Sequence, residues 1–115
     1  MSFTVNTKNH DDAVEISLSG SGMITTDFDE LYEISDALIA KGSVNLILNI
    51  ENVKVLNSIG LNALIKMLTK TRNAGGDLTI VNISDKINQL LLLTKLNTVL
   101  NIANSIEEAV LSFKN

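Results

Sequence analysis

Residues 54–68 read KVLNSIGLNALIKML, and they join an expected strand to an expected helix. The strand is VNLILNI, residues 44–50, in which every second residue is apolar and Ile47 makes the opposite face apolar as well. That pattern is typical of a strand buried on both faces of a covered sheet. After the junction, a hydrophobic stripe at helical spacing predicts a helix packed on this sheet; the stripe consists of Leu61, Leu64, Ile65 and Leu68.

Ser58 lies at the junction, where we predict that it is the N-cap of the helix. The simplest interpretation is that Ser58 caps the helix and does nothing more. A second interpretation uses the same geometry, because a helix N-terminus carries about half a positive charge and several free donors. A phosphate on Ser58 would be tolerated there, and it would add roughly −1.5 to −2 charge to an uncharged loop tip. Such a site could be switched while the fold stays intact.

The residues before the junction predict a hairpin and a helix. Two alternating segments, 3–7 and 14–19, favour paired strands with a turn at 9–12 and polar side chains exposed on the second strand. The single histidine, His10, lies in that turn, where we interpret it as a solvated residue rather than a metal ligand. Thr26 and Asp29 resemble a capping box that starts a helix reaching Ala40.

The residues after the junction predict two more strands and two more helices. A Gly75-Gly76 turn ends the central helix, and a strand follows over residues 77–82. Ser84 and Ser105 are expected N-caps of the last two helices, with a short strand at 98–102 between them. The sequence therefore predicts an α/β fold with the order β-β-α-β-α-β-α-β-α. We expect one domain over residues 1–115, with a mostly parallel central sheet, an N-terminal antiparallel hairpin and about four helices.

The composition narrows the function classes. The chain has 115 residues, is 45% hydrophobic and only 3% aromatic, and carries no cysteine, so we expect an aliphatic core without disulfides or thiol chemistry. No run of 18 apolar residues and no signal peptide is visible, so we expect a cytoplasmic protein that does not insert into membranes. A net charge of −4 with scattered Lys and Arg argues against nucleic acid as the partner.

The sequence shows no catalytic constellation. It has no phosphate-binding loop of the Gly-x-x-x-x-Gly-Lys type, and a Ser-His-Asp triad would have to use His10, far from Ser58 in the sequence. The adjacent acids Glu107 and Glu108 lie at a helix start, where they complement the helix dipole. We therefore expect no enzyme activity, no catalytic residue, no metal site and no cofactor.

Residues 57–61, Asn57-Ser58-Ile59-Gly60-Leu61, resemble the Asp-Ser-Ser/Thr-Gly-Leu signature of anti-sigma-factor antagonists, which are bacterial members of the STAS domain family. The strand before them, the Gly75-Gly76 turn and the start of the last helix at Ser105 resemble the family's features in the same order. The resemblance covers essentially the whole chain.

The resemblance implies partner switching in the regulation of transcription. Such antagonists bind an anti-sigma factor that is also a serine kinase, which releases a sigma factor. The kinase phosphorylates the signature serine, which matches Ser58, and a phosphatase resets it. On this basis the expected partner-binding residues are Asn57, Ser58, Ile59, Gly60, Asn62 and Lys66.

Departures from the signature keep other functions open. Asn57 stands where the family usually has Asp, Ile59 replaces a small hydroxylated residue, and the segment 22–25 lacks an acidic residue found in many antagonists. One alternative is a non-phosphorylated STAS interaction module, either a signalling scaffold or an accessory subunit of a lipid-transport ATPase. The loop could also bind a small molecule or nucleotide, and an enzyme is the last alternative. The apolar run Leu90–Leu93 further suggests a homodimer.

Overall fold

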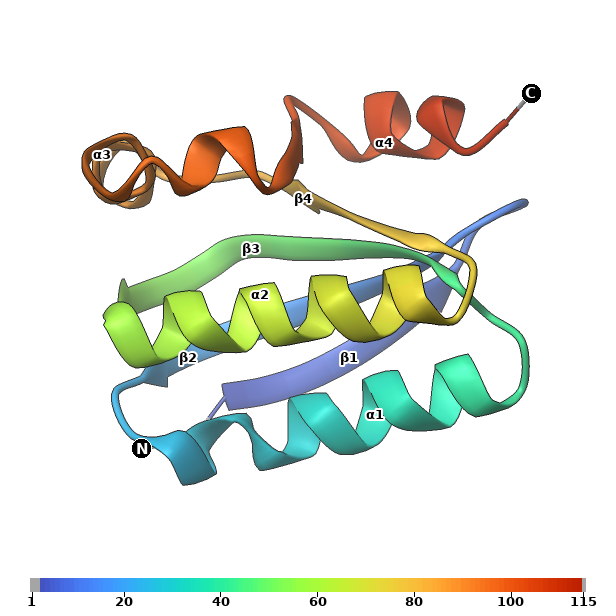
Figure 1. Cartoon of the computed structure of the whole chain (residues 1–115), viewed down its shortest axis with the longest axis horizontal. Helices are drawn as coiled ribbons and strands as arrows, with labels where there is room; N and C mark the ends of the chain where they lie inside the picture. Colours follow the sequence, from blue (N-terminus) through green and yellow to red (C-terminus); the bar gives the residue numbers. More distant parts are fainter. Residues whose placement is uncertain (1–2, 115) are drawn as a thin grey trace.

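The computed structural model describes residues 3–114, and its elements follow the predicted order. Residues 1, 2 and 115 of the predicted domain lie outside this range. Figure 1 shows the arrangement of the elements. In chain order they are β1 (Phe3–Asn9), β2 (Val14–Gly22), the 3₁₀ turn η1 (Thr25–Phe28), α1 (Asp29–Ala40), β3 (Asn45–Leu56), α2 (Ser58–Asn73), β4 (Asp77–Val81), α3 (Asp85–Thr94), the 3₁₀ turn η2 (Leu96–Thr98), β5 (Asn101–Ala103) and α4 (Ile106–Ser112).

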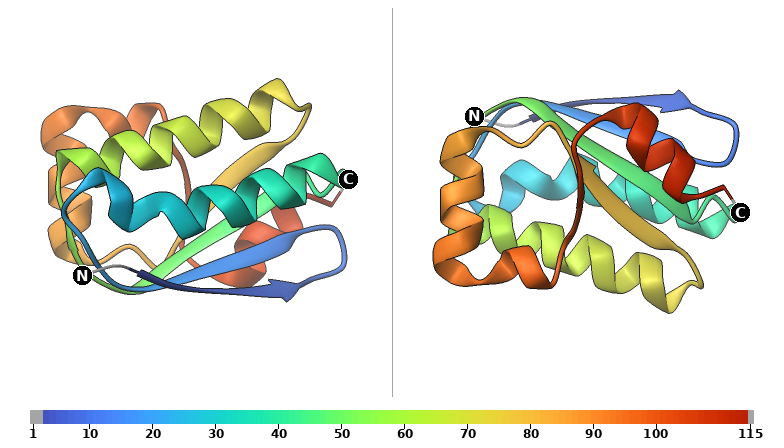
Figure 2. Two further views of the ribbon diagram at one scale, coloured as in Figure 1. Left: turned by 90° about the horizontal axis from the view of Figure 1, so that it is seen from below. Right: turned by 90° about the horizontal axis from the view of Figure 1, so that it is seen from above.

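The strands form one sheet in the order β1-β2-β3-β4-β5. β1 and β2 are antiparallel, and every later neighbouring pair is parallel. Figure 2 shows α1 and α2 over one face of this sheet and α4 over the other. The predicted mostly parallel α/β sheet with an antiparallel N-terminal pair and four helices is therefore confirmed.

The central strand β3 is buried on both faces, as its sequence predicts. Leu46 and Leu48 belong to the main core with residues of α1, α2 and α3, whereas Ile47 packs in a smaller cluster with Ala109 of α4. β3 is longer than the predicted 44–50, because its later residues still pair with β2 up to Leu56 opposite Gly22. The turn into α2 is thus confined to Asn57.

Several predicted boundaries are wrong for local reasons. β2 continues through Gly22, beyond the predicted residues 14–19, and β5 covers only Asn101–Ala103 because Thr98 belongs to η2. The Thr26–Asp29 capping box is also wrong. Asp27 instead accepts the backbone N–H groups of Met23 and Ile24 at 2.9 and 3.1 Å, so its carboxylate fixes the start of η1.

The interpretation of His10 as a solvated residue is wrong. Its Nε2 lies 2.9 Å from Oε1 of Glu15, a β2 residue that is only 6% exposed although we expected it on a solvated strand face. Glu15 also accepts hydrogen bonds from Ser17 Oγ and Asn49 Nδ2, each at 3.0 Å. Burial alone would raise the pKa of Glu15, but the hydrogen bonds from Asn49, His10 and Ser17 and the charge on His10 outweigh burial and lower it.

The predicted N-caps of the last two helices are confirmed. Ser84 Oγ accepts from the Ile87 N–H at 3.2 Å, and Ser105 Oγ accepts from the Glu108 N–H at 3.1 Å, so both serines are N-caps. Gly76 is required sterically, because a Cβ there would overlap the Val44 carbonyl oxygen. Across residues 3–114, none of the helices has the length and apolar character needed to cross a membrane.

Candidate partner-binding site

The start of α2 is fixed by Asn57 and not by Ser58. Asn57 Oδ1 accepts from the backbone N–H groups of Ile59 and Gly60, at 3.1 and 3.2 Å. The prediction that Ser58 is the N-cap is therefore wrong, because β3 extends to Leu56 and places Asn57 at the capping position. Asparagine caps helices as well as serine does. Ser58 becomes the first residue of the helix, and the fold does not use its hydroxyl as a cap.

The same Asn57 side chain joins two loops. Its Nδ2 donates to the carbonyl oxygen of Met23 at 3.0 Å, which ties the loop after β2 to the start of α2. The Asp27 carboxylate accepts hydrogen bonds from the Met23 and Ile24 N–H groups of that loop. These hydrogen bonds lower the pKa of the Asp27 carboxyl group. The two loops therefore form one surface, which we call the α2 entry surface; it comprises Met23, Ile24, Asn57, Ser58 and Ile59.

The α2 entry surface presents a hydroxyl among apolar side chains. Ser58 is exposed, and its side chain makes no hydrogen bond to any other residue in the range 3–114. Met23, Ile24 and Ile59 are 49%, 57% and 36% exposed. Apolar side chains gathered around one polar group are typical of a protein interface rather than of a solvated loop. The sequence indicated Ile59 but not the two residues that approach from the loop after β2.

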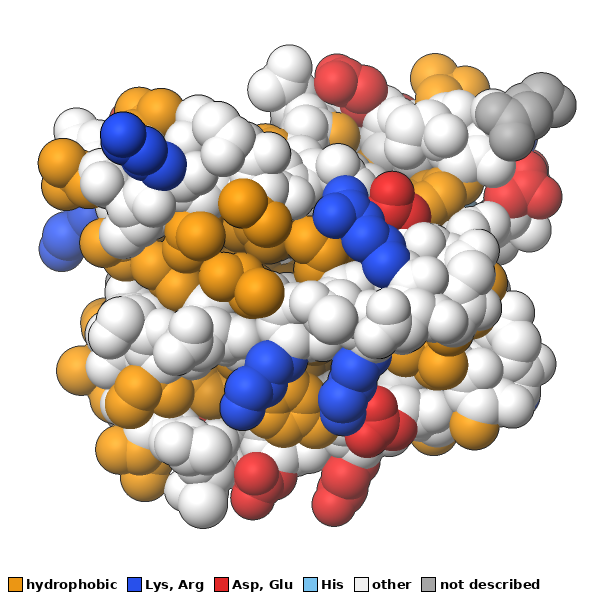
Figure 3. All heavy atoms as spheres, in the orientation of Figure 1, with side chains coloured by type: hydrophobic (Ala, Val, Ile, Leu, Met, Phe, Trp, Pro, Cys, Tyr) orange, Lys and Arg blue, Asp and Glu red, His pale blue; other side chains and the backbone are white. Residues whose placement is uncertain are grey.

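An apolar groove of about 310 Å³ lies beside this surface, between the end of β3 and α3. Val55, Leu90 and Leu93 line it together with Lys54 and Lys86. Figure 3 shows hydrophobic side chains gathered between α2 and α3. Within the apolar run Leu90–Leu93, Leu92 and Leu93 are 54% and 82% exposed.

The remaining predicted site residues fall into two groups. Gly60 is buried, and a Cβ there would overlap the Leu56 side chain and lie 3.3 Å from Phe28 Cζ, so packing inside the chain accounts for it. Asn62 and Lys66 are exposed on α2, and their spacing of four residues places them on one face of the helix.

No three His, Cys, Asp or Glu residues within the described range gather to form a metal site.

The family model for the STAS domain matches residues 4–109, and the chain belongs to the STAS domain family. Among curated proteins, the anti-sigma-B factor antagonist of Staphylococcus aureus is 25% identical over 107 residues, which cover 93% of this chain and 98% of the relative. The corresponding Staphylococcus epidermidis protein is also 25% identical, with the same coverage.

Solved structures share the fold across nearly the whole chain. A Thermotoga maritima protein described as a candidate anti-sigma factor antagonist superposes with a TM-score of 0.84 at 23% identity, over 96% of this chain and 95% of that one. The Bacillus cell fate determinant SpoIIAA in its phosphorylated form gives a TM-score of 0.68 at 19% identity, over 95% and 96%. At these identities the superpositions establish the fold.

Proposed function

We propose that this protein is an anti-sigma factor antagonist that binds an anti-sigma factor through its α2 entry surface. The observation that carries the proposal is that Ser58 is exposed, shares a surface with exposed apolar side chains and has no capping role. Membership of the STAS family and the names of the staphylococcal relatives support this choice of partner. The function is then regulatory and not enzymatic, and it is exercised in the cytoplasm by a single domain.

The second part of the proposal is that the anti-sigma factor is a serine kinase that phosphorylates Ser58, and that a phosphatase removes the phosphate. Because Asn57 caps the helix, a phosphate on Ser58 leaves the start of α2 in place. The added charge would have to be desolvated against an apolar partner surface, which costs several kcal/mol. A cost of about 3 kcal/mol weakens binding roughly a hundredfold.

The proposed contact residues are those of the α2 entry surface together with Asn62 and Lys66, which extend the exposed face along α2. Gly60 contributes indirectly, because its lack of a side chain lets α2 pack closely against Leu56. Ile59 is the apolar residue nearest to the phosphorylation site in the chain. Its exposure matches that of an anchor residue that a partner would bury.

The test is a phosphorylation assay with the purified protein, the anti-sigma factor kinase of the same cell and ATP. We expect a mass increase of one phosphate that maps to Ser58 and is abolished by Ser58→Ala. The matched control is Ser84→Ala, which removes another exposed serine at a helix start and should leave the phosphate in place. Phosphate that persists in Ser58→Ala, or no phosphate at all, contradicts the kinase step.

One observation favours the alternative of a non-phosphorylated STAS interaction module, as a scaffold or as an accessory subunit of a lipid-transport ATPase. Ile59 places an apolar side chain, 36% exposed, directly beside Ser58, which suits a constitutive interface. In that case Ser58→Glu would leave the complex intact, whereas partner switching predicts its loss.

Self-association through Leu93 would appear as a dimer in sedimentation, and the dimer should disappear in Leu93→Lys.

A further inference from the structure

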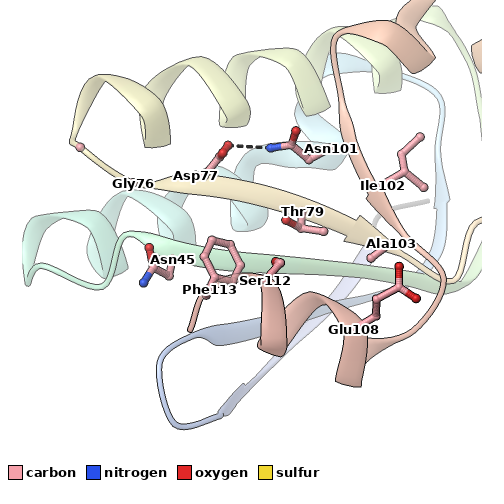
Figure 4. Close-up of a pocket in the computed structure, with 11 residues that line it drawn as sticks. Asn45, Gly76, Asp77, Thr79, Asn101, Ile102, Ala103, Glu108, Ser112 and Phe113 are labelled. Carbon is pink, nitrogen blue, oxygen red and sulfur yellow. Dashed lines mark hydrogen bonds between the residues drawn. The ribbon is translucent and has the colours of Figure 1, made fainter. Parts of the chain in front are cut away.

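A second site lies in a cleft of about 530 Å³ between α4 and the β4–β5 edge of the sheet. Figure 4 shows side chains from β3, β4, β5 and α4 around this cleft. Asn45 and Asp77, the first residues of β3 and β4, mark one end of it. Ser58 follows the opposite end of β3, so the cleft is separate from the α2 entry surface. Its volume falls in the range of small-molecule sites.

The cleft carries negative charge that is only partly compensated. Asp77 Oδ1 accepts hydrogen bonds from Arg72 Nε, the Leu78 N–H and Asn101 Nδ2, at 3.1, 2.9 and 2.9 Å. Its second oxygen, Oδ2, has no hydrogen-bond partner among residues 3–114. Glu108 lines the other side of the cleft and forms no ion pair within that same range. No Lys or Arg side chain lines the cleft.

The two amide side chains of the cleft also present acceptors. Asn101 Nδ2 uses both of its hydrogens inside the protein, on Asp77 Oδ1 and on the Leu78 carbonyl oxygen at 3.2 Å. Asn45 Nδ2 donates to the carbonyl oxygen of Asp12 at 3.0 Å. The carbonyl oxygens of both amides have no partner within the described residues. A ligand would therefore meet acceptors on several sides and few donors.

The side chain of Thr79 adds a polar group that points into the cleft and has no partner among the described residues. Thr79 is 7% exposed and lines the cleft, yet its hydroxyl makes no hydrogen bond to another residue in the range 3–114. No fully enclosed side-chain N or O atom in that range lacks a partner, so the Thr79 hydroxyl must open into the cleft. Because the cleft is open to solvent, water can satisfy this hydroxyl, and a ligand in the cleft can replace that water with its own hydrogen-bonding group.

We propose that this cleft binds a small organic cation with several N–H donors, of the primary amine or guanidinium class. Within residues 3–114, Glu108 supplies an unpaired charge, and Asp77 supplies its free Oδ2 although Arg72 is ion-paired with its other oxygen. The carbonyl oxygens and the Thr79 hydroxyl supply further acceptors. The ring of Phe113 adds an aromatic face against which a cation or its carbon chain can pack. Anions are disfavoured because the cleft combines two carboxylates with few free donors.

The proposal is tested with the intact protein by amide chemical-shift titration, using agmatine as the cation and succinate as an anion of similar length. We expect agmatine to cause saturable shifts centred on Thr79, Asn101 and Ala103, and succinate to cause none. Glu108→Gln should weaken agmatine binding about tenfold, as expected for the loss of one charge-assisted hydrogen bond. Thr79→Val should also weaken binding while preserving the shape of the side chain.

Glu107→Gln is the matched control, because Glu107 is the exposed neighbour of Glu108 at the same helix start but does not line the cleft. It should change the affinity less than about twofold. Equal weakening by the two variants would mean that agmatine responds only to the net charge of −4 and would overturn the proposal. Chemical-shift changes centred on other residues, or no saturation up to about 10 mM agmatine, would also overturn the proposal.

Discussion

Asn57 Nδ2 donates a hydrogen bond to the carbonyl oxygen of Met23 at 3.0 Å, although Met23 lies 34 positions earlier in the chain. Because the other end of this amide caps α2, one side chain sets both the helix start and the loop beside Ser58. An aspartate, which the antagonist signature usually carries here, could cap the helix but could not donate to that carbonyl.

Replacement of Asn57 should therefore separate these two roles. Asn57→Ala should lower the free energy of unfolding by about 1–2 kcal/mol, since both the cap and the bond to Met23 are lost. Asn57→Asp should keep most of the stability, because a carboxylate caps well and complements the helix dipole. It should, however, increase hydrogen exchange around Met23. Urea denaturation and amide exchange measure both effects.

Ser58→Ala is the control for that pair of variants. It should change the free energy of unfolding by less than about 0.5 kcal/mol, as for a surface residue without a structural partner. A loss for Ser58→Ala as large as that for Asn57→Ala would show that Ser58 does have a capping role.

Gly60 and Gly76 should differ in how much stability an added methyl group costs. In Gly60→Ala the Cβ meets the Leu56 side chain, which can shift, and the helix gains about 1 kcal/mol in propensity, so the net loss should be about 1 kcal/mol. In Gly76→Ala the Cβ meets the Val44 backbone carbonyl, which is held by a hydrogen bond from the Asp77 N–H, so the loss should be about 3 kcal/mol or more. Thermal and urea unfolding of both variants check this order, and the reverse order would contradict it.

The patterns that predicted the fold are local ones. The alternation in β2, the two apolar faces of β3 and the stripe at Leu61, Leu64 and Leu68 each reflect which faces are buried, so the element order follows from the sequence. Ser84 and Ser105 were correctly predicted as caps, although Asn104 stands directly before Ser105 just as Asn57 stands before Ser58. At α2 two adjacent residues could both cap, and the length of β3 decided in favour of Asn57.

The polar contacts that the sequence did not reveal join residues far apart in the chain. Glu15 meets Asn49 because β2 lies beside β3, and Asp77 meets Asn101 because β4 lies beside β5. No spacing within either segment encodes such a pair. The exposure of Met23 and Ile24 next to Ser58 likewise depends on how two loops meet. Residue pattern therefore indicated Ser58 and Ile59, but only the folded chain defines the surface around them.

The network around Glu15 should make stability depend on acid pH. The pKa of Glu15 lies below its ordinary value of 4.5 in the folded protein, so its anion contributes stability above that value. This contribution is lost as the pH falls below 4.5 through the lowered pKa. The free energy of unfolding of the wild type should exceed that of Glu15→Gln by about 1–3 kcal/mol at neutral pH, and the difference should shrink on acidification.

Urea denaturation of both proteins between about pH 7 and pH 3 measures this difference. Asp27 titrates in the same direction, because its pKa is also lowered, but it is present in both proteins and cancels in the comparison. A difference that stays constant across the pH range would show that the Glu15 anion is not what stabilises the network.

Substitutions on the α2 entry surface should reduce binding without reducing stability. Ile59→Lys and Ile24→Lys place a charge on side chains that are 36% and 57% exposed, so the free energy of unfolding should change by less than about 0.5 kcal/mol. If the anti-sigma factor buries these side chains, each variant should lose at least about 2 kcal/mol of binding, or roughly thirtyfold in affinity. Leu111→Lys is the matched control, because Leu111 is 65% exposed on α4, on the opposite face of the sheet. Calorimetric titration against the anti-sigma factor should show full affinity for Leu111→Lys, and an equal loss in all three variants would place the interface elsewhere.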